Sequence, residues 1–312
     1  MRSFLLGSTA VALATLVPVV AGAQRGNDRN RDREFQEAAS RVDTTFAFNR
    51  SGVVDLRQIS GDVVVTAWDR AEARVRAYAE RGRVRSDVSS SRLTLAIEPV
   101  RGRVGDSRFE VTVPVGVRVI ARSTSGDVSV KGTKGPVQAT STSGDVEVVD
   151  ATDRIVIESV SGDVRAAQLV GDVRSEAVSG TIEIRDVNGD IRAETTSGDV
   201  SLTRVVSRNV VTTTVSGETE YEGTVDASGR YEFHAHSGDI RLEIPETTSA
   251  QFSIETFSGS LDTEFPLTLQ PGQRTSSRPR RFQFTLGGGS ARVTAESFSG
   301  DIVLVRRART ER

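Results

Sequence analysis

The sequence predicts an all-β protein wound as a parallel β-helix, or β-solenoid, in which each coil has about 18 residues and two strands. A Ser-Gly dipeptide returns every 18 residues between Ser125 and Ser197, and a fixed period is typical of stacked repeats. Between the dipeptides, apolar and polar residues alternate, as they do in strands with one buried face. Because parallel crossovers strongly favour one hand, we expect right-handed coils.

Residues 1–23 are typical of a secretory signal peptide. Arg2 precedes an apolar run from Phe4 to Val20, which ends at the small-residue site Ala21-Gly22-Ala23. A retained membrane anchor is the alternative, but the run is shorter than the roughly 20 apolar residues that a span needs. The chain has no cysteine, which excludes disulfides and a lipidated cysteine. We therefore expect an exported protein, periplasmic or extracellular at the cell surface, without a transmembrane span after signal cleavage.

The remaining charge and composition give limits on partners. Residues 24–41 are dense in charge and are predicted to form a flexible leader. Over the whole chain, Asp+Glu 42 and Lys+Arg 40 nearly balance. The protein therefore lacks the strongly positive field that attracts nucleic acid, and we expect no nucleic-acid partner.

Residues 42–121 are predicted to form an N-terminal β cap and the first coils. Short runs with Val, Ile, Thr or Phe at every second position indicate half-buried strands, as in "RLTLAIEPV" and "RFEVTVPVGVRVIARS". No helical periodicity is found after residue 80.

Residues 122–312 are predicted to form the repeat solenoid. After Ser197, the Ser-Gly pair returns with growing insertions, and the largest insertion is a loop at about 262–290. A second turn follows most Ser-Gly pairs by nine residues, so each coil should have two strands and two corners. Apolar residues two positions after the corner glycine should stack inward, and they are Val128, Val146, Val164, Ile182, Val200, Ile240, Leu261 and Ile302.

The Ser-Gly-Asp corner is assigned a structural role. Glycine supplies a positive φ, while the Ser and Asp side chains are expected to bond to local backbone amides. A carboxylate column about 5 Å apart would also suit a retaining glycosidase, and related turns bind calcium. An active site is needed once, however, and the double-glycine calcium loop is missing. The corner residues are Gly126, Asp127, Gly144, Asp145, Gly162, Asp163, Gly198, Asp199, Gly238, Asp239, Gly300 and Asp301.

The segment "EFHAH" holds the two histidines of the chain and is a candidate metal site. Glu232, His234 and His236 should share one face of a strand, and Glu255, 21 residues after His234, should lie beside it one coil on. Two imidazoles and a carboxylate can bind zinc or iron. The alternative is an exposed pair of histidines near a corner without metal.

The large insertion before the last coil is the candidate binding site. Insertions that leave coils intact project as loops, where binding often occurs. Positive charge and aromatic surface suit an anionic glycan, a lipid headgroup or an acidic protein patch. The alternative is a hairpin that covers the last coils with its phenylalanines inward. The candidate residues are Arg274, Arg278, Arg280, Arg281, Phe282 and Phe284.

The chain resembles the putative-adhesin family of exported bacterial β-strand repeat proteins, which is a domain of unknown function. The resemblance covers residues 42–305 and rests on the repeated "SGDV", on "LRQISGDVVVTAW", on "VTVPVGVRVIARSTSGDV" and on "GGGSARVTAESFSGDIVLV". It implies surface adhesion but assigns no catalytic or binding residue.

The expected function is therefore a non-enzymatic binding or structural surface at the cell envelope, with no cofactor and with an envelope glycan or envelope protein as partner. One alternative is a polysaccharide-active or metal-dependent enzyme built on the same β-helix. A second alternative is an envelope-stress sensing module.

Overall fold

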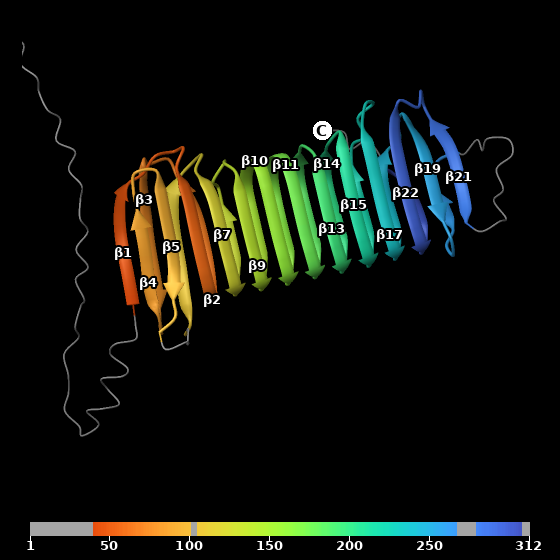
Figure 1. Cartoon of the computed structure of the whole chain (residues 1–312). Helices are drawn as coiled ribbons and strands as arrows, with labels where there is room; N and C mark the ends of the chain where they lie inside the picture. Colours follow the sequence, from red (N-terminus) through yellow and green to blue (C-terminus); the bar gives the residue numbers. More distant parts are fainter. Residues whose placement is uncertain (1–39, 101–104, 267–278, 308–312) are drawn as a thin grey trace, which may run out of the picture. The chain divides into compact units, whose positions relative to one another are not determined.

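The computed structural model describes residues 40–100, 105–266 and 279–307. These residues form 23 strands joined in one sheet, without a helix among them, so the predicted all-β class is confirmed (Figure 1). The strands are β1 (Ser40–Ala47), β2 (Val53–Trp68), β3 (Glu72–Ala79), β4 (Arg83–Val88), β5 (Arg92–Glu98), β6 (Ser107–Pro114), β7 (Arg118–Ser125), β8 (Val128–Lys131), β9 (Val137–Ser143), β10 (Val146–Ser161), β11 (Val164–Ser179), β12 (Ile182–Asn188), β13 (Ile191–Ser197), β14 (Val200–Val206), β15 (Asn209–Ser216), β16 (Thr219–Gly223), β17 (Arg230–Ser237), β18 (Ile240–Pro245), β19 (Ala250–Thr256), β20 (Leu261–Thr263), β21 (Arg280–Leu286), β22 (Ala291–Ser299) and β23 (Ile302–Arg307).

The predicted signal peptide and the leader as far as residue 39 lie outside the described residues. Within the part of the chain that the structure describes, no helix is long and apolar enough to cross a membrane.

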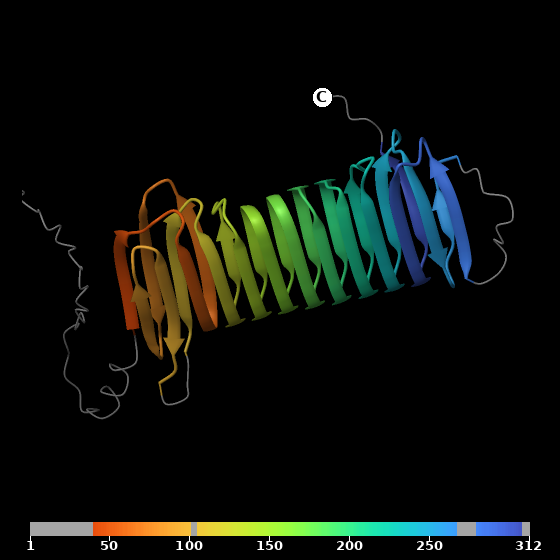
Figure 2. The same cartoon turned by 45° about the horizontal axis from the view of Figure 1, so that its top comes forward.

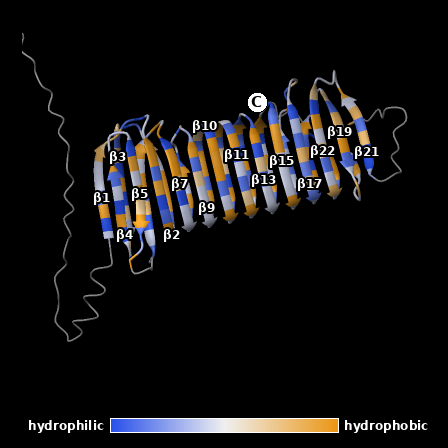
Figure 3. Cartoon of the chain, viewed as in Figure 1, coloured by the Kyte–Doolittle hydropathy of each residue, from blue (hydrophilic) through white to orange (hydrophobic). Residues whose placement is uncertain are grey.

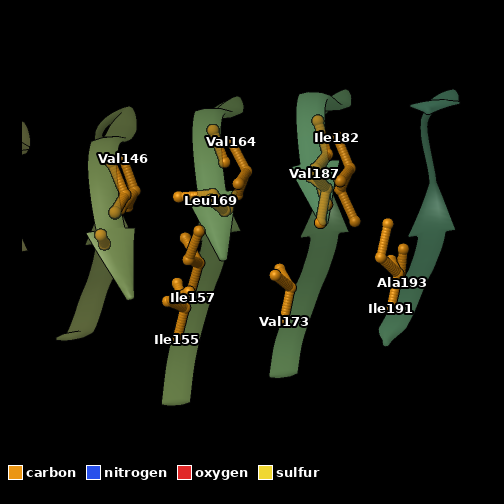
Figure 4. Packing of buried hydrophobic residues seen from close by; sticks show 14 of the residues in the cluster. Val146, Ile155, Ile157, Val164, Leu169, Val173, Ile182, Val187, Ile191 and Ala193 are labelled. Atoms are coloured by element: carbon orange, nitrogen blue, oxygen red, sulfur yellow. The ribbon is translucent and has the colours of Figure 1, made fainter. Parts of the chain in front are cut away.

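Strands of successive repeats stack in parallel, one repeat apart (Figures 1 and 2). Val146 pairs with Val164, and Val164 pairs with Ile182 on the next strand. Their side chains point inward and are fully or almost fully buried, so equivalent residues form continuous apolar columns (Figure 4). Hydrophilic residues alternate with them along each strand and face the solvent (Figure 3). Each buried Val or Ile contributes about 1.5–3 kcal/mol, so the stacked columns hold the coils together.

Glycine is required at the corner for two reasons. Gly162 has a φ of 149°, in the region that L side chains rarely adopt, and a Cβ atom there would lie 2.2 Å from the carbonyl oxygen of Gly144 in the preceding coil. Gly300 lies outside that φ region, but a Cβ atom there would lie 2.1 Å from Gly238 O. The predicted positive φ is found at Gly126, Gly144, Gly162, Gly198 and Gly238.

The corner aspartates bond between coils, which corrects the expected local turn. Asp145 Oδ1 accepts a hydrogen bond from the backbone N–H of Asp163, at 2.9 Å and 18 residues further on. The reason is the close approach of successive glycine corners, which brings the next coil's amide within reach of each carboxylate. The same bond from the next coil's amide is accepted by Asp127, Asp163, Asp199, Asp239 and Asp301.

Several coils contain a bend that the sequence did not indicate. Asp150, Gln168, Asp186 and Arg204 follow one another at intervals of one repeat, and each has a φ between 54° and 57°. Gly132, with a φ of 73°, occupies the same position one repeat before Asp150, and Asp is common in turns, but the expected second turn lies three residues later in each coil. A bidentate ion pair joins this bend in two neighbouring coils: Arg204 donates hydrogen bonds to both carboxylate oxygens of Asp186, at 2.6 and 2.7 Å.

The first strands pair differently from the rest. Strand β1 pairs antiparallel with β3, β3 pairs antiparallel with β6, and β4 pairs antiparallel with β5. Strand β2 is already parallel to β7 and β8. The N-terminal part of the described chain therefore carries antiparallel strands at the end of a parallel stack.

At the C-terminal end, stacking order departs from chain order. Strand β22 lies between β17 and β19 and is parallel to both, and β23 likewise pairs with both β18 and β20. Strand β21 pairs antiparallel with β19 and occupies the outer position. The last coil in sequence is therefore inserted before the preceding one in space, contrary to the sequential stacking that the repeat predicted.

Candidate functional site: an outward face with an exposed apolar ladder

The residue immediately before the Ser-Gly dipeptide of each stacked corner, from Ser60-Gly61 onward, is exposed, and these residues stack into one line that we call the outer ladder. The residues on either side of each are paired strand to strand, which fixes the line. In spatial order, the outer ladder consists of Ile59, Thr124, Thr142, Val160, Val178, Thr196, Val215, His236, Phe298 and Phe257.

The outer ladder concentrates the exposed apolar side chains of the described residues. Ten large hydrophobic side chains are exposed among all the described residues. Six of these ten belong to the outer ladder, with exposed fractions between 38% and 50%. Scattered surface hydrophobics need no explanation, but several that fall on one line bordered by polar residues are typical of a contact surface. The six are Ile59, Val160, Val178, Val215, Phe257 and Phe298.

A second line, two residues earlier on each strand, carries charge, and we call it the charged ladder. It begins with arginine at the N-terminal coils and becomes acidic in the middle and at the C-terminal end. In spatial order, the charged ladder consists of Arg57, Arg122, Thr140, Glu158, Glu176, Glu194, Thr213, His234, Glu296 and Glu255.

Ion pairs along the strands reduce the repulsion between stacked glutamates. Arg174 bonds to Glu176 and Arg192 bonds to Glu194, each two residues apart on the same outward face. Repulsion between like charges on neighbouring strands is otherwise destabilising. At the other end, Arg57 and Arg122 share the carboxylate of Asp55, with N–O distances of 2.8 and 3.4 Å.

At the C-terminal end, a hollow of about 280 Å³ lies between the two ladders. His234 Nδ1 lies 3.3 Å from Glu296 Oε2, and Arg281 Nε lies 2.9 Å from Glu255 Oε2. The aromatic side consists of stacked rings, with centroids 5.1 Å apart between His236 and Phe298 and 4.8 Å apart between Phe298 and Phe257. The lining residues are His234, Ala235, Glu255, Phe257, Pro279, Glu296, Ser297 and Phe298.

The candidate metal residues are not brought together as the sequence predicted. Glu255 does not lie beside His234, because the strand of Glu296 is inserted between them. His236 stacks on Phe298 instead, and Glu232 pairs with Arg230 at 2.6 Å. Among the residues that the structure describes, no group of three or more His, Asp or Glu side chains is placed to hold a metal ion.

The four candidate arginines of the insertion differ in where the structure places them. Arg274 and Arg278 lie outside the described residues. Arg280 donates to Gly259 O at 3.0 Å, whereas Arg281 reaches the edge of the hollow through Glu255.

The two phenylalanines of the insertion face the core. Phe284 is 2% exposed and stacks on Phe252 across the β19–β21 pair, with ring centroids 4.9 Å apart, and Phe282 packs partly buried against the core. The alternative of a hairpin with inward phenylalanines is therefore correct, and the expected aromatic contact surface at Phe282 and Phe284 is not found. The physical reason is that the outermost strand must cover the apolar end of the stack.

The outer ladder was missed by reasoning from the sequence, although its signal is visible there. The position before Ser-Gly holds Ile, Val, Thr, His or Phe in every repeat, and strand alternation places it outward when the position before it is buried.

Solved structures similar to this chain include two putative adhesins and a putative lipid binding protein. No curated protein matches the chain. A putative adhesin from Bacteroides fragilis NCTC 9343 is 10% identical, covers 85% of this chain and 97% of its own, and has a TM-score of 0.44. A putative adhesin from Parabacteroides distasonis ATCC 8503 is 11% identical with the same coverages and a TM-score of 0.36. A putative lipid binding protein from the same organism is 10% identical, again covers 85% and 97%, and has a TM-score of 0.32.

A family model matches most of the repeat region. The model is described as Toastrack DUF4097, and it matches residues 117–169 and 170–305, which together are more than half of the chain. The match includes the corner repeats, the outer ladder from Thr124 onward and the inserted last coil, so the chain belongs to the Toastrack DUF4097 family.

Proposed function

We propose that the protein is an exported, non-enzymatic β-solenoid that acts as an adhesin-like binding surface at the cell envelope. The single observation that carries the proposal is the outer ladder, in which six of the ten exposed large hydrophobic side chains of the described residues form one line. Keeping valine and phenylalanine in water at the same position of many repeats is unfavourable unless something covers them. The signal peptide predicted for residues 1–23 supports export.

The finer description of the fold is part of the same proposal. Pairing of residues 18 apart, as between Val146 and Val164, supports two-strand coils of that length. The strong chirality of parallel crossovers supports a right-handed winding. Residues 42–121 would then form the cap and first coils, and residues 122–312 the repeat solenoid.

The geometry of the acidic residues supports a binding role over catalysis. Glu255 and Glu296 lie on neighbouring strands, an arrangement that the paired carboxylates of a glycosidase also require. A carboxyl that acts as general acid is normally held in an apolar pocket. The side chain of Glu255 is instead 33% exposed to solvent, and that of Glu296 is 52% exposed. The corner aspartates are occupied by backbone amides of the next coil.

Envelope binding by a ladder variant tests the proposal. The variant Val160→Ser/Val178→Ser/Val215→Ser removes apolar surface from the middle of the outer ladder. Isolated envelopes are separated into glycan and protein fractions, and the amount of protein that each fraction retains is measured. The amount of the variant retained should be at least about fivefold lower than that of the unchanged protein. Glycan cleavage should not be detected in the same incubations.

The matched control is Val170→Ser/Val206→Ser, which removes two equally exposed valines at 53% from a different position of the coils. This control should bind as the unchanged protein does. Equal binding by the ladder variant and the control, or any bond cleavage, would contradict the proposed function.

A further inference from the structure

We propose that the partner of the outward face is a second copy of this chain, packed face to face with its coils running in the opposite direction. This inference rests on the proposed function and names its partner: the envelope component that the outward face binds is another copy of this chain. The outward face is here the outer ladder, the charged ladder and a third line two positions before the charged ladder. In spatial order, the third line consists of Asp55, Ile120, Gln138, Val156, Arg174, Arg192, Val211, Glu232, Thr294 and Ser253. Two patterns lie side by side on this face, one apolar and one of opposite charges at the two ends.

The spacing of the face matches a second copy. Ladder residues recur at the strand separation of a β-sheet, about 4.8 Å, and a second copy has the same spacing. Two such faces therefore stay in register over all ten coils, with side chains interdigitating as in packed β-sheets. A partner with another repeat length would lose register after a few coils.

The area of the face suits a stable dimer. Ten coils at about 4.8 Å and three outward residues on each strand give roughly 43 Å by 18 Å, or about 800 Å². A specific interface of standard size buries about 800 Å² on each partner. The face is thus close to the required size.

The apolar pattern is compatible with a two-fold axis. An axis in the interface, parallel to the strands and between β11 and β13, reverses the order of the coils and keeps the outer ladder opposite the outer ladder. Val160 then lies opposite Val215 of the second copy, and Ile59 lies opposite Phe257. Each apolar residue at one end is thereby covered by an apolar or β-branched residue from the other end.

The charge pattern selects this orientation. With the coils reversed, Arg57 and Arg122 face Glu255 and Glu296 of the second copy. With the coils running in the same direction, arginine would face arginine and glutamate would face glutamate, which is costly at an interface. In the centre, the facing glutamates each keep an arginine of their own strand, as Arg174 does for Glu176.

The first test is the oligomeric state of charge-reversal variants, measured by analytical ultracentrifugation over a concentration series at low and moderate salt. The unchanged protein should be a dimer that weakens with salt. Each of Arg122→Glu and Glu296→Arg should raise the dissociation constant at least about tenfold, because each places two repelling pairs in a symmetric dimer. The double variant Arg122→Glu/Glu296→Arg should return to within about threefold of the unchanged protein.

The matched control is Glu183→Arg, on the outward side of the opposite strands, where Glu183 pairs with Arg165 and Ser201. It should leave the dimer unchanged. A monomer at all concentrations, single reversals without effect, or a double variant that is not rescued would each overturn the inference.

The second test measures orientation and remains decisive if a charge variant fails to fold. The chain has no cysteine, so single-cysteine variants give a clean background. Val178→Cys lies next to the proposed axis and should be joined to its counterpart by a short bis-maleimide. Thr124→Cys lies about seven coils from its counterpart, or about 34 Å, and should not be joined. Equal crosslinking of both would indicate coils running in the same direction and would overturn the inference.

The dimer and the envelope-binding function can fail separately. If the unchanged protein is monomeric while the ladder valine variant still loses envelope binding, the second copy is the wrong partner and the proposed function stands. If the dimer forms and the ladder variant keeps its envelope binding, the inference stands and the proposed function fails.

Discussion

The carboxylate of Asp163 accepts a hydrogen bond from the backbone N–H of Thr181 in the next coil, at 3.0 Å. The same relationship recurs along the corner column, including positions where the next residue is Thr, Glu or Ser instead of Asp. The aspartate therefore serves the coil that follows it, and the donor needs only a backbone amide. This explains why the slot tolerates substitution at Thr181, Glu218 and Ser260.

Replacing Asp163 by alanine should lower the free energy of unfolding by about 1–2 kcal/mol, because the N–H of Thr181 loses its acceptor. Asp163→Asn should cost less than half as much, since the amide oxygen can still accept that bond. Urea unfolding followed by circular dichroism measures both. Equal destabilisation by the two variants would show that charge, and not the acceptor, is what matters.

Gly162→Ala should destabilise the protein by at least about 3 kcal/mol, because its Cβ atom would meet Gly144 O at 2.2 Å in addition to the strained φ of 149°. Gly132→Ala is the matched control, since Gly132 has a φ of 73° but nothing within 4 Å of an added Cβ atom. The control should cost only about 1–2 kcal/mol. Similar losses at both positions would refute the role of close approach between coils.

Acid should destabilise the stack through the corner carboxyls. The pKa of Asp145 lies below its ordinary value, mainly because Arg165 donates a hydrogen bond and also because the Asp163 amide does. The pKa of Asp301 is likewise lowered, first by the backbone N–H of Ser260 and then by its hydroxyl. A lowered pKa in the folded state contributes stability that is present above the unfolded value of 3.8 and is lost as the pH falls through the folded value.

The midpoint of urea unfolding should therefore change little between pH 7 and about pH 5 and should fall steeply below about pH 4. Asp145→Asn should make that fall shallower, whereas Asp87→Asn, on the exposed strand β4, should not. A pH profile of Asp145→Asn that superimposes on that of the unchanged protein would count against this account.

Two phenylalanines near the C-terminal end should behave oppositely. Phe284→Ala removes a ring that is 2% exposed and stacked on Phe252, so it should lower stability by about 3–5 kcal/mol. Phe298→Ala removes a ring that is 50% exposed, so stability should change by less than about 1 kcal/mol while dimerisation and envelope binding weaken. Thermal unfolding together with the binding assay distinguishes them. A large stability loss for Phe298→Ala would show that the outer ladder is structural.

The sequence by itself determined the class of the fold, the strand pattern and the position of the corners. Val146 and Val164 could be aligned without a structure because a strand has a side-chain period of two and the repeat returns each residue to the same face. The need for glycine at the Ser-Gly corner was equally readable, because few other residues adopt a positive φ.

Only the tertiary structure decided the order of the last coils and, with it, the neighbours of His234. Strand β22 can pair with β17 or β19 because every coil presents the same alternating backbone and the same apolar columns to the next. Local pattern therefore does not distinguish a sequential stack from one with an inserted coil. The β19–β21 pair takes the outer position, where Phe252 and Phe284 pack together near the end of the core, and Glu296 instead of Glu255 then faces His234.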